Sequence, residues 1–285
     1  MRQSKLFLLL LVAALMFTAC GTIPPAAGTA PPQTEAAEPA APVTRTLIET
    51  HTIETVVGDM TVSTKNEYHY DPAGLLQEII AYSGDAEVSR TTVENNEHGE
   101  PIRQTTVSGS STSITESQRT YDADGNLTQC IDTVTQDGIV TDIREYTYNP
   151  DHTLAKAVFT TQGENAYATS NVYEYDENGN EIVEIITGSN GTSTRVETQY
   201  DENGRITRTE TAAQNAAGEI QQYVEYIYEA DGSVKQQAYT PDGTPTPNYT
   251  VSTYNEYGNP LTTETHIGDT LVMRMTYTYV TITVG

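Results

Sequence analysis

The chain has 285 residues, with 14 Lys and Arg against 39 Asp and Glu, so its formal net charge is −25 at pH 7. Phosphate backbones repel such an acidic chain, which argues against a nucleic-acid-binding protein. A hydrophobic share of 36% argues against a protein built from many membrane-spanning helices, and two cysteines are too few for a disulfide framework.

Residues 1–19 have the pattern of a signal peptide. Arg2 and Lys5 precede an uncharged apolar run that ends at Phe17, and small residues then precede Cys20. The run is shorter than the roughly 20 residues of a permanent spanning helix. Residues 17–20, Phe-Thr-Ala-Cys, resemble the bacterial lipobox, in which the cysteine is acylated and becomes the mature N-terminus. We therefore expect lipidation at Cys20, and an ordinary secretory signal is the alternative.

Residues 20–42 predict a lipidated cysteine followed by a tether. The stretch is dominated by Pro, Ala, Thr and Gly and holds too few hydrophobic residues to bury a core. Loss of residues 1–19 removes Arg2, Lys5 and no acid, which changes the net charge from −25 to −27. These features predict an extracytoplasmic lipoprotein of the cell envelope that contacts the membrane through its lipid anchor.

Residues 43–285 predict one repeat domain. Turn sequences of the form Tyr-Asp-x-x-Gly recur eight times, at intervals of 25 to 28 residues. Degenerate copies end at Gly99, His152, Gly232 and Gly258. The clearest copies contain Tyr70, Asp71 and Gly74; Tyr121, Asp122 and Gly125; Tyr175, Asp176 and Gly179; and Tyr200, Asp201 and Gly204.

A second series of glycine turns lies halfway between these copies, for example at Gly58, Gly84 and Gly138. The segments between turns alternate in polarity and are rich in Tyr, Thr, Val and Ile, which is typical of strands. We therefore expect an all-β antiparallel hairpin array, a long meander of about 18 strands. Because strongly twisted open sheets rarely exceed roughly ten strands, the sheet should curl or roll up with its tyrosine stripe inside. A β-propeller-like arrangement is the alternative.

The repeat is similar to a known family. Residues 119–127, Arg-Thr-Tyr-Asp-Ala-Asp-Gly-Asn-Leu, resemble the YD repeat of bacterial RHS-type proteins, and the resemblance covers residues from about 66 to 262. It implies long β-sheets of the kind found in cell-surface and toxin-encapsulating proteins, with links to carbohydrate binding and cell contact. This chain departs from the family in its longer spacing and in mostly lacking the Arg before the Tyr.

The sequence predicts no catalytic residues and no cofactor. The histidines fall in turns or on strands among polar neighbours, and no nucleophile, base and orienting group are predicted to converge. Cys130 lies in a strand, where we expect a small buried side chain. The histidines are His51, His69, His98, His152 and His266.

Two of the turns echo the oxygen-rich spacing of calcium loops. These are Asp122-Ala-Asp124 and Asp176-Glu-Asn178. The simpler interpretation is that the Asp caps the turn while Gly adopts a positive φ. We therefore predict no metal site, and a calcium-binding repeat protein is kept as an alternative.

The repeat explains most tyrosines as packing residues, and those outside it are candidates for ligand contact. We select Tyr239, Tyr249 and Tyr257 as candidate contacts, since the first two flank a Pro-rich turn. The predicted function is a surface-anchored, non-catalytic binding or adhesion module for a carbohydrate or a partner protein. The alternative is a structural envelope lipoprotein that has no small ligand and whose sheet pairs with other proteins.

Overall fold

The computed structural model describes residues 43–163, 166–213 and 220–284, and within these ranges every regular element is a strand. The predicted signal peptide, Cys20 and the tether lie outside the described residues. The 18 strands are β1 (Val43–Val57), β2 (Met60–Tyr70), β3 (Leu76–Ser83), β4 (Ala86–Asn95), β5 (Pro101–Ser108), β6 (Ser111–Tyr121), β7 (Leu127–Gln136), β8 (Ile139–Tyr148), β9 (Leu154–Thr161), β10 (Ala168–Tyr175), β11 (Glu181–Gly188), β12 (Ser193–Tyr200), β13 (Ile206–Ala213), β14 (Ile220–Tyr228), β15 (Val234–Tyr239), β16 (Pro245–Tyr254), β17 (Pro260–Ile267) and β18 (Thr270–Val284).

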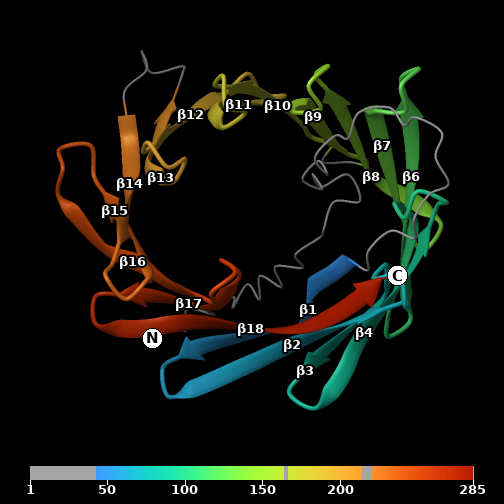
Figure 1. The fold of residues 1–285 in the computed structure, drawn as a ribbon, viewed down its shortest axis with the longest axis horizontal. Helices are drawn as coiled ribbons and strands as arrows, with labels where there is room; N and C mark the ends of the chain where they lie inside the picture. Colours follow the sequence, from blue (N-terminus) through green and yellow to red (C-terminus); the bar gives the residue numbers. More distant parts are fainter. Residues whose placement is uncertain (1–42, 164–165, 214–219, 285) are drawn as a thin grey trace, which may run out of the picture.

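The sheet closes on itself. Each strand pairs antiparallel with its neighbours in sequence, and β1 also pairs with β18, from Val43 opposite Val284 to Thr55 opposite Met273. Figure 1 shows the resulting ring. The predicted all-β hairpin array of about 18 strands, rolled up, is thus confirmed as an up-and-down barrel. A propeller would divide the strands among separate sheets, whereas here one sheet holds all of them.

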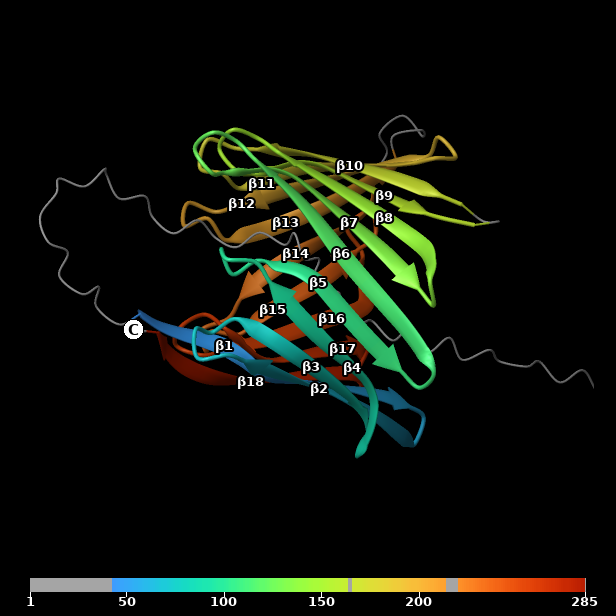
Figure 2. The same cartoon turned by 90° about the vertical axis from the view of Figure 1, so that its right-hand side faces the viewer.

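Turns alternate between the two ends of the barrel because consecutive strands run in opposite directions. We call the end that carries the Tyr-Asp-x-x-Gly turns the tyrosine rim, and the end that carries the second glycine series the glycine rim. Val43 and Val284, paired at the ends of the longest strands, lie at the tyrosine rim. Figure 2 shows this rim at the left, on the side of the C-terminus.

The two faces of the sheet differ in exposure. On β12, Thr198 and Tyr200 are half-buried while Glu197 and Gln199 are exposed. Closure crowds side chains on the concave side of a sheet, so we identify the tyrosine face as the inner face. Burial raises the pKa of Tyr70, Tyr148 and Tyr173 to about 12, in keeping with this placement.

The most deeply packed part of the inner face lies on β7–β10. Cys130, Tyr146 and Ala157 are buried there side by side, as the cross-strand register requires. Partly buried hydrophobic side chains pack around them, namely Tyr148, Leu154, Phe159 and Tyr173. Cys130 is fully buried, as its place in a strand predicted.

Candidate functional site

The aspartates of the repeat turns hold the turn backbone. Asp122 Oδ1 accepts hydrogen bonds from the backbone N–H of Asp124 (3.0 Å) and of Asn126 (2.8 Å), while Gly125 has φ +85°. The Gly125 N–H donates to the Asp122 carbonyl, so the loop is a type I turn closed by a glycine bulge. The Asn126 backbone N–H and side-chain amide donate hydrogen bonds to the Asp122 carboxylate, and these bonds are the main reason that its pKa is lowered.

The same arrangement recurs at the other clear copies. Asp71, Asp176 and Asp201 each accept two backbone N–H bonds at the same offsets. Where Gly is replaced, His152 adopts φ +70° instead. Among the described residues, no group of three or more His, Cys, Asp or Glu is placed to hold a metal ion. The backbone hydrogen bonds therefore support the turn-capping interpretation of these aspartates.

The tyrosines of the repeat hold the strand ends together. Each of five tyrosines at or near the end of an even-numbered strand donates its hydroxyl hydrogen to a backbone carbonyl of the preceding strand. We call these contacts tyrosine latches: Tyr70 to Ile48 (2.8 Å), Tyr175 to Leu154 (2.9 Å), Tyr200 to Glu181 (2.7 Å), Tyr228 to Ile206 (2.9 Å) and Tyr279 to Pro260 (2.7 Å).

In each latch, the accepting carbonyl lies just beyond the point at which backbone pairing between the two strands ends. The last backbone pair of β11 and β12 is Val183 with Glu197, and the acceptor Glu181 lies two residues beyond it. The other four latches show the same offset from the last pair. The tyrosine hydroxyl therefore satisfies a carbonyl that the sheet leaves unpaired, which accounts for the tyrosine stripe structurally.

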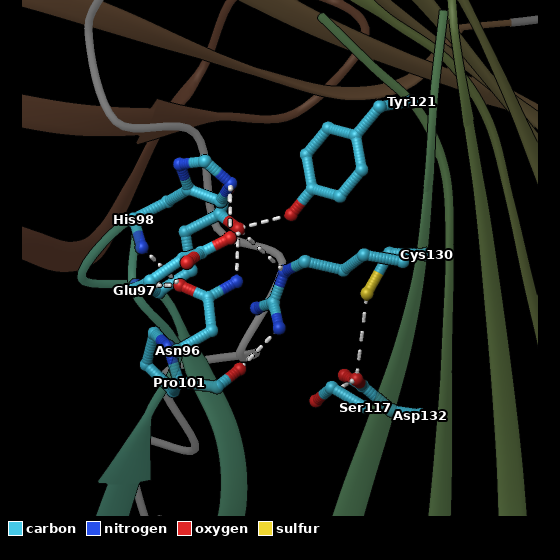
Figure 3. A network of polar contacts seen from close by, with 10 residues as sticks. Asn96, Glu97, His98, Pro101, Ser117, Tyr121, Cys130 and Asp132 are labelled. Atoms are coloured by element: carbon cyan, nitrogen blue, oxygen red, sulfur yellow. Dashed lines mark hydrogen bonds and ion pairs between the residues drawn. The ribbon is translucent and has the colours of Figure 1, made fainter. Parts of the chain in front are cut away.

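Arg119 lies two residues before the Tyr of its repeat and belongs to a polar network between the β4–β5 turn and β6. Figure 3 shows this network, with Asn96, Pro101 and Tyr121 labelled. The Arg119 side chain is 4% exposed, contacts the Pro101 carbonyl and lies with Nε 3.6 Å from Glu100 Oε2. The Tyr121 hydroxyl donates to the same carboxylate in place of a latch, and Asn96 Nδ2 donates to it at 2.9 Å. The network fastens the β4–β5 turn to β6.

A fully buried carboxylate lies farther along the inner face. Asp132 accepts a hydrogen bond from the Ser117 hydroxyl at 2.6 Å, and the sulfur of Cys130 lies 3.6 Å from the same Oδ1 atom. Burial raises the pKa of Asp132, opposed by Ser117 and by the charges of Arg119 and Arg144. Asp132 and Cys130 are fully buried, so neither side chain is open to a substrate in this structure.

The described histidines lie apart from one another and serve local contacts. His51 is buried on β1 and stacks on Tyr277, with 4.6 Å between ring centroids, and burial lowers its pKa. His98 is in a turn, 3.7 Å from Glu97, and His266 lies on β17. None of these histidines lies with a nucleophile and a second orienting group among the described residues.

Two of the three candidate contact residues come together on the outer face of β13–β17. Tyr239 lies directly opposite Tyr223, and the two rings stack with centroids 4.9 Å apart. Tyr249 lies directly opposite His266, and these rings stack at 4.7 Å. Tyr257 is elsewhere: it lies in the turn before β17 at the tyrosine rim and is 75% exposed.

A cation lies over each stack. The Arg208 guanidinium is 3.6 Å from the Tyr223 ring centroid, and the Lys235 ammonium is 4.6 Å from that of Tyr249. Arg208 also pairs with Glu210 at 2.6 Å. We call the surface formed by Arg208, Tyr223, Lys235, Tyr239, Tyr249 and His266 the aromatic face.

Sequence reasoning missed three members of the aromatic face, namely Arg208, Lys235 and His266, whereas Tyr223 is one of the tyrosines outside the repeat that it favoured for contact. The signal that could have found His266 is the hairpin of β16 and β17, whose turn fixes the register. Counting back from that turn places position 249 opposite position 266 once the bulge beside Tyr254 is included. The bulge adds one unpaired residue, Leu261, to β17 and shifts the register by one, so counting without the bulge misplaces the pair.

The two rims carry different side chains. Acidic residues crowd the turns of the tyrosine rim: Asp71, Glu97, Asp122, Asp124, Asp151, Asp176, Glu177, Asp201, Glu202, Glu229, Asp231 and Glu256. The described turns of the glycine rim carry fewer, namely Asp59, Asp85, Asp137, Asp242 and Asp269. Exposed large hydrophobic side chains are more numerous at this rim: Val57, Met60, Val62, Val88, Val107, Ile139, Val140, Tyr167 and Ile267. Those exposed at the tyrosine rim are Ile102, Tyr228, Tyr254, Tyr257 and Leu261.

In the described part of the chain, no helix has the length and apolar character to cross a membrane.

Comparison with known proteins identifies similar solved structures only. No family model and no curated protein matches the chain. A porin-like protein from Bacteroides uniformis is 13% identical over 82% of this chain and 98% of its own, with a TM-score of 0.40. A porin-like protein from Bacteroides vulgatus is 11% identical over 83% of this chain and 99% of its own, with a TM-score of 0.33.

The Tc holotoxin pore of Photorhabdus luminescens is 11% identical over 75% of this chain, with a TM-score of 0.27. This chain spans only 15% of the length of that toxin chain. At these identities and TM-scores, the similarities carry no argument about what this barrel does.

Proposed function

We propose that this chain is a lipid-anchored, extracytoplasmic and non-catalytic binding module that binds carbohydrate through the aromatic face. The anchor is a lipid on Cys20, and the barrel is the binding domain. A partner protein bound at the same face is the second possibility.

The aromatic face is the observation that carries this proposal. Tyrosine faces pack against the C–H faces of sugar rings, while neighbouring amide and charged groups bond to sugar hydroxyls. Here Tyr239 and Tyr249 lie on adjacent strands, and the half-buried carboxylate of Glu225 lies in the same cross-strand row as Tyr249. Neither tyrosine belongs to a latch, and each packs on one cross-strand aromatic partner.

The structure argues against one form of the structural alternative. A sheet that pairs with other proteins needs a strand edge with unpaired backbone groups. Every strand of the described barrel has a partner on both sides, and β1–β18 pairing removes the last edge. An envelope protein of this fold would have to use its rims or its outer side chains instead.

Binding is tested by presenting the chain from Cys20 onward to an array of glycans. We expect binding that Tyr239→Ala or Tyr249→Ala abolishes. The matched control is Tyr82→Ala, since Tyr82 is also an outer-face tyrosine under a cation, with Lys65 4.7 Å from its ring centroid, but lies on β3. Absence of binding to every glycan, together with recovery of one protein partner, would overturn the carbohydrate assignment.

The anchor is tested separately. Mass spectrometry of the membrane-extracted protein should show a mature N-terminus at Cys20 that carries a lipid mass. Cys20→Ser should release the protein from the membrane fraction. A mature chain that begins elsewhere, or that carries no lipid, would contradict the lipid anchor while leaving the aromatic face untested by that experiment.

A further inference from the structure

We propose that the glycine rim lies against the membrane, with the hydrophobic side chains of its hairpin tips among the lipid headgroups, and that the tether runs past the barrel to reach that surface. This orientation rests on the lipid anchor of the proposed function. It adds which end of the barrel contacts the bilayer.

The first support is the exposed apolar side chains at the hairpin tips of this rim. Met60 is 67% exposed at the tip of the β1–β2 hairpin, Ile139 is 70% exposed at the tip of β7–β8, and Ile267 is 53% exposed at the tip of β17–β18. Folded proteins seldom leave large apolar groups this open at several neighbouring tips.

The arrangement of these tips favours a flat partner. They follow the rim from the β17–β18 hairpin round to the hairpin of β9 and β10, so they extend around the mouth of the barrel and do not form one compact patch. A folded protein would cover one sector of such a ring, whereas a bilayer surface meets all the tips at once. Interfacial insertion of apolar side chains is the usual way in which such surfaces bind a bilayer.

The charge distribution gives an independent argument. Anionic headgroups repel acidic surfaces, and the tyrosine rim carries most of the turn carboxylates. The glycine rim retains Asp59, Asp85, Asp137, Asp242 and Asp269, so its binding should weaken as the anionic lipid content rises. Of the two ends of the barrel, the glycine rim is the one that both signals favour.

The tether must then reach from one rim to the other. Val43 begins β1 at the tyrosine rim, and the chain from Cys20 to Val43 spans about 75 Å when extended, at roughly 3.3–3.6 Å per residue. Strands of 8 to 11 residues, as in most of the barrel, are about 26–36 Å long. The tether is therefore long enough to run the height of the wall and leave the glycine rim at the bilayer.

The chain contains no Trp, so a single introduced Trp reports without background. Because Cys130 is not a free thiol in the structure, the chain from Cys20 onward would carry Cys130→Ala, so that Cys20 is its single thiol. We would couple this chain through Cys20 to a maleimide lipid in phosphatidylcholine vesicles containing brominated lipid. The bromines should quench Ile139→Trp fluorescence by about twofold or more, and Met60→Glu in the same chain should reduce that quenching. Tyr257→Trp, at the opposite rim, is the matched control, and the brominated lipid should not quench its fluorescence.

Equal quenching of both reporters, or stronger quenching of the control, would overturn the orientation. A blue shift of Ile139→Trp without vesicles, together with a doubled mass in sedimentation, would instead identify a second copy as the partner of this rim. Because the anchor is attached chemically, the result does not depend on whether cells lipidate Cys20. Failure here and failure of the lipid anchor are thus separate outcomes.

Discussion

The tyrosine latches predict a specific effect of removing one oxygen atom. In Tyr200→Phe the ring remains and only the hydroxyl is lost, so packing on the inner face is kept. The lost interaction is the 2.7 Å hydrogen bond to the Glu181 carbonyl, which lies beyond the last backbone pair of β11 and β12. A net hydrogen bond is worth about 0.5–1.5 kcal/mol, and a half-buried carbonyl without a partner moves the cost toward the upper end of that range. We expect a loss of about 1 kcal/mol.

Equilibrium unfolding in urea, followed by tyrosine fluorescence or far-ultraviolet circular dichroism, measures the loss. Tyr70→Phe and Tyr200→Phe lie on distant strands, so their effects should add in the double variant. Tyr257→Phe is the control, because its ring lies in an exposed turn and belongs to no latch described above. A midpoint for Tyr200→Phe equal to that of the unmodified protein, at an unchanged slope, would refute the latch as a source of stability.

Three further results are expected. Gly99→Ala should destabilise the barrel more than Gly125→Ala in urea titrations. Both glycines have positive φ, but a Cβ at position 99 would lie 2.9 Å from Leu75 Cδ2, whereas a Cβ at position 125 would meet nothing within 4 Å. Equal losses of stability in the two variants would contradict this prediction. Hydrogen bonds from Asn180 hold the pKa of Asp176 below its usual range, so the charged carboxylate stabilises the fold at neutral pH. This stabilisation is lost as the pH falls through the lowered pKa of Asp176. The stability difference between the protein and Asp176→Asn should therefore shrink on acidification below about pH 4, and a difference that stays constant down to pH 2 would count against it. Millimolar calcium should leave the melting temperature unchanged, because backbone amides already occupy the turn carboxylates; a rise of several degrees would restore the calcium alternative.

The strands and turns of this fold could be predicted because their signals are local. Asp, Gly and the alternation of Tyr with polar residues act within a few residues, and each repeat shows them again. Closure of the barrel could not be predicted in this way, because it depends on residues far apart in the sequence. The pairing of Val43 with Val284 joins the two ends of the described chain, and nothing in either strand marks the other as its partner. Twist limits open sheets to roughly ten strands and so explains why a meander this long must curl. Only the accumulated twist and stagger of all strands decide that it closes.

The candidate contacts show the same limit. Tyr249 and Tyr257 are close in sequence, and both were selected as candidate contacts. In the structure the rest of β16 and a bulge lie between them, so Tyr257 is carried to the tyrosine rim. Tyr223 and Tyr239 are farther apart in sequence yet stack directly, because β14 and β15 pair in register. Distance along the chain is a poor guide on a sheet, where register decides which side chains meet.

The proposed aromatic face and the most exposed apolar tips of the glycine rim lie in different sectors of the barrel, although β17 carries both His266 and Ile267, and this makes the two functions separable. The aromatic face lies on β13–β17, below the β15–β16 hairpin, whose tip carries Pro241 and Asp242 and none of the exposed hydrophobic residues. The most exposed apolar tips belong to β1–β2 and β7–β8. A barrel resting on those tips would therefore leave the aromatic face open at its side. Met60→Glu should then release the rim without changing glycan binding, and Tyr239→Ala should remove glycan binding without changing the quenching of the rim reporter.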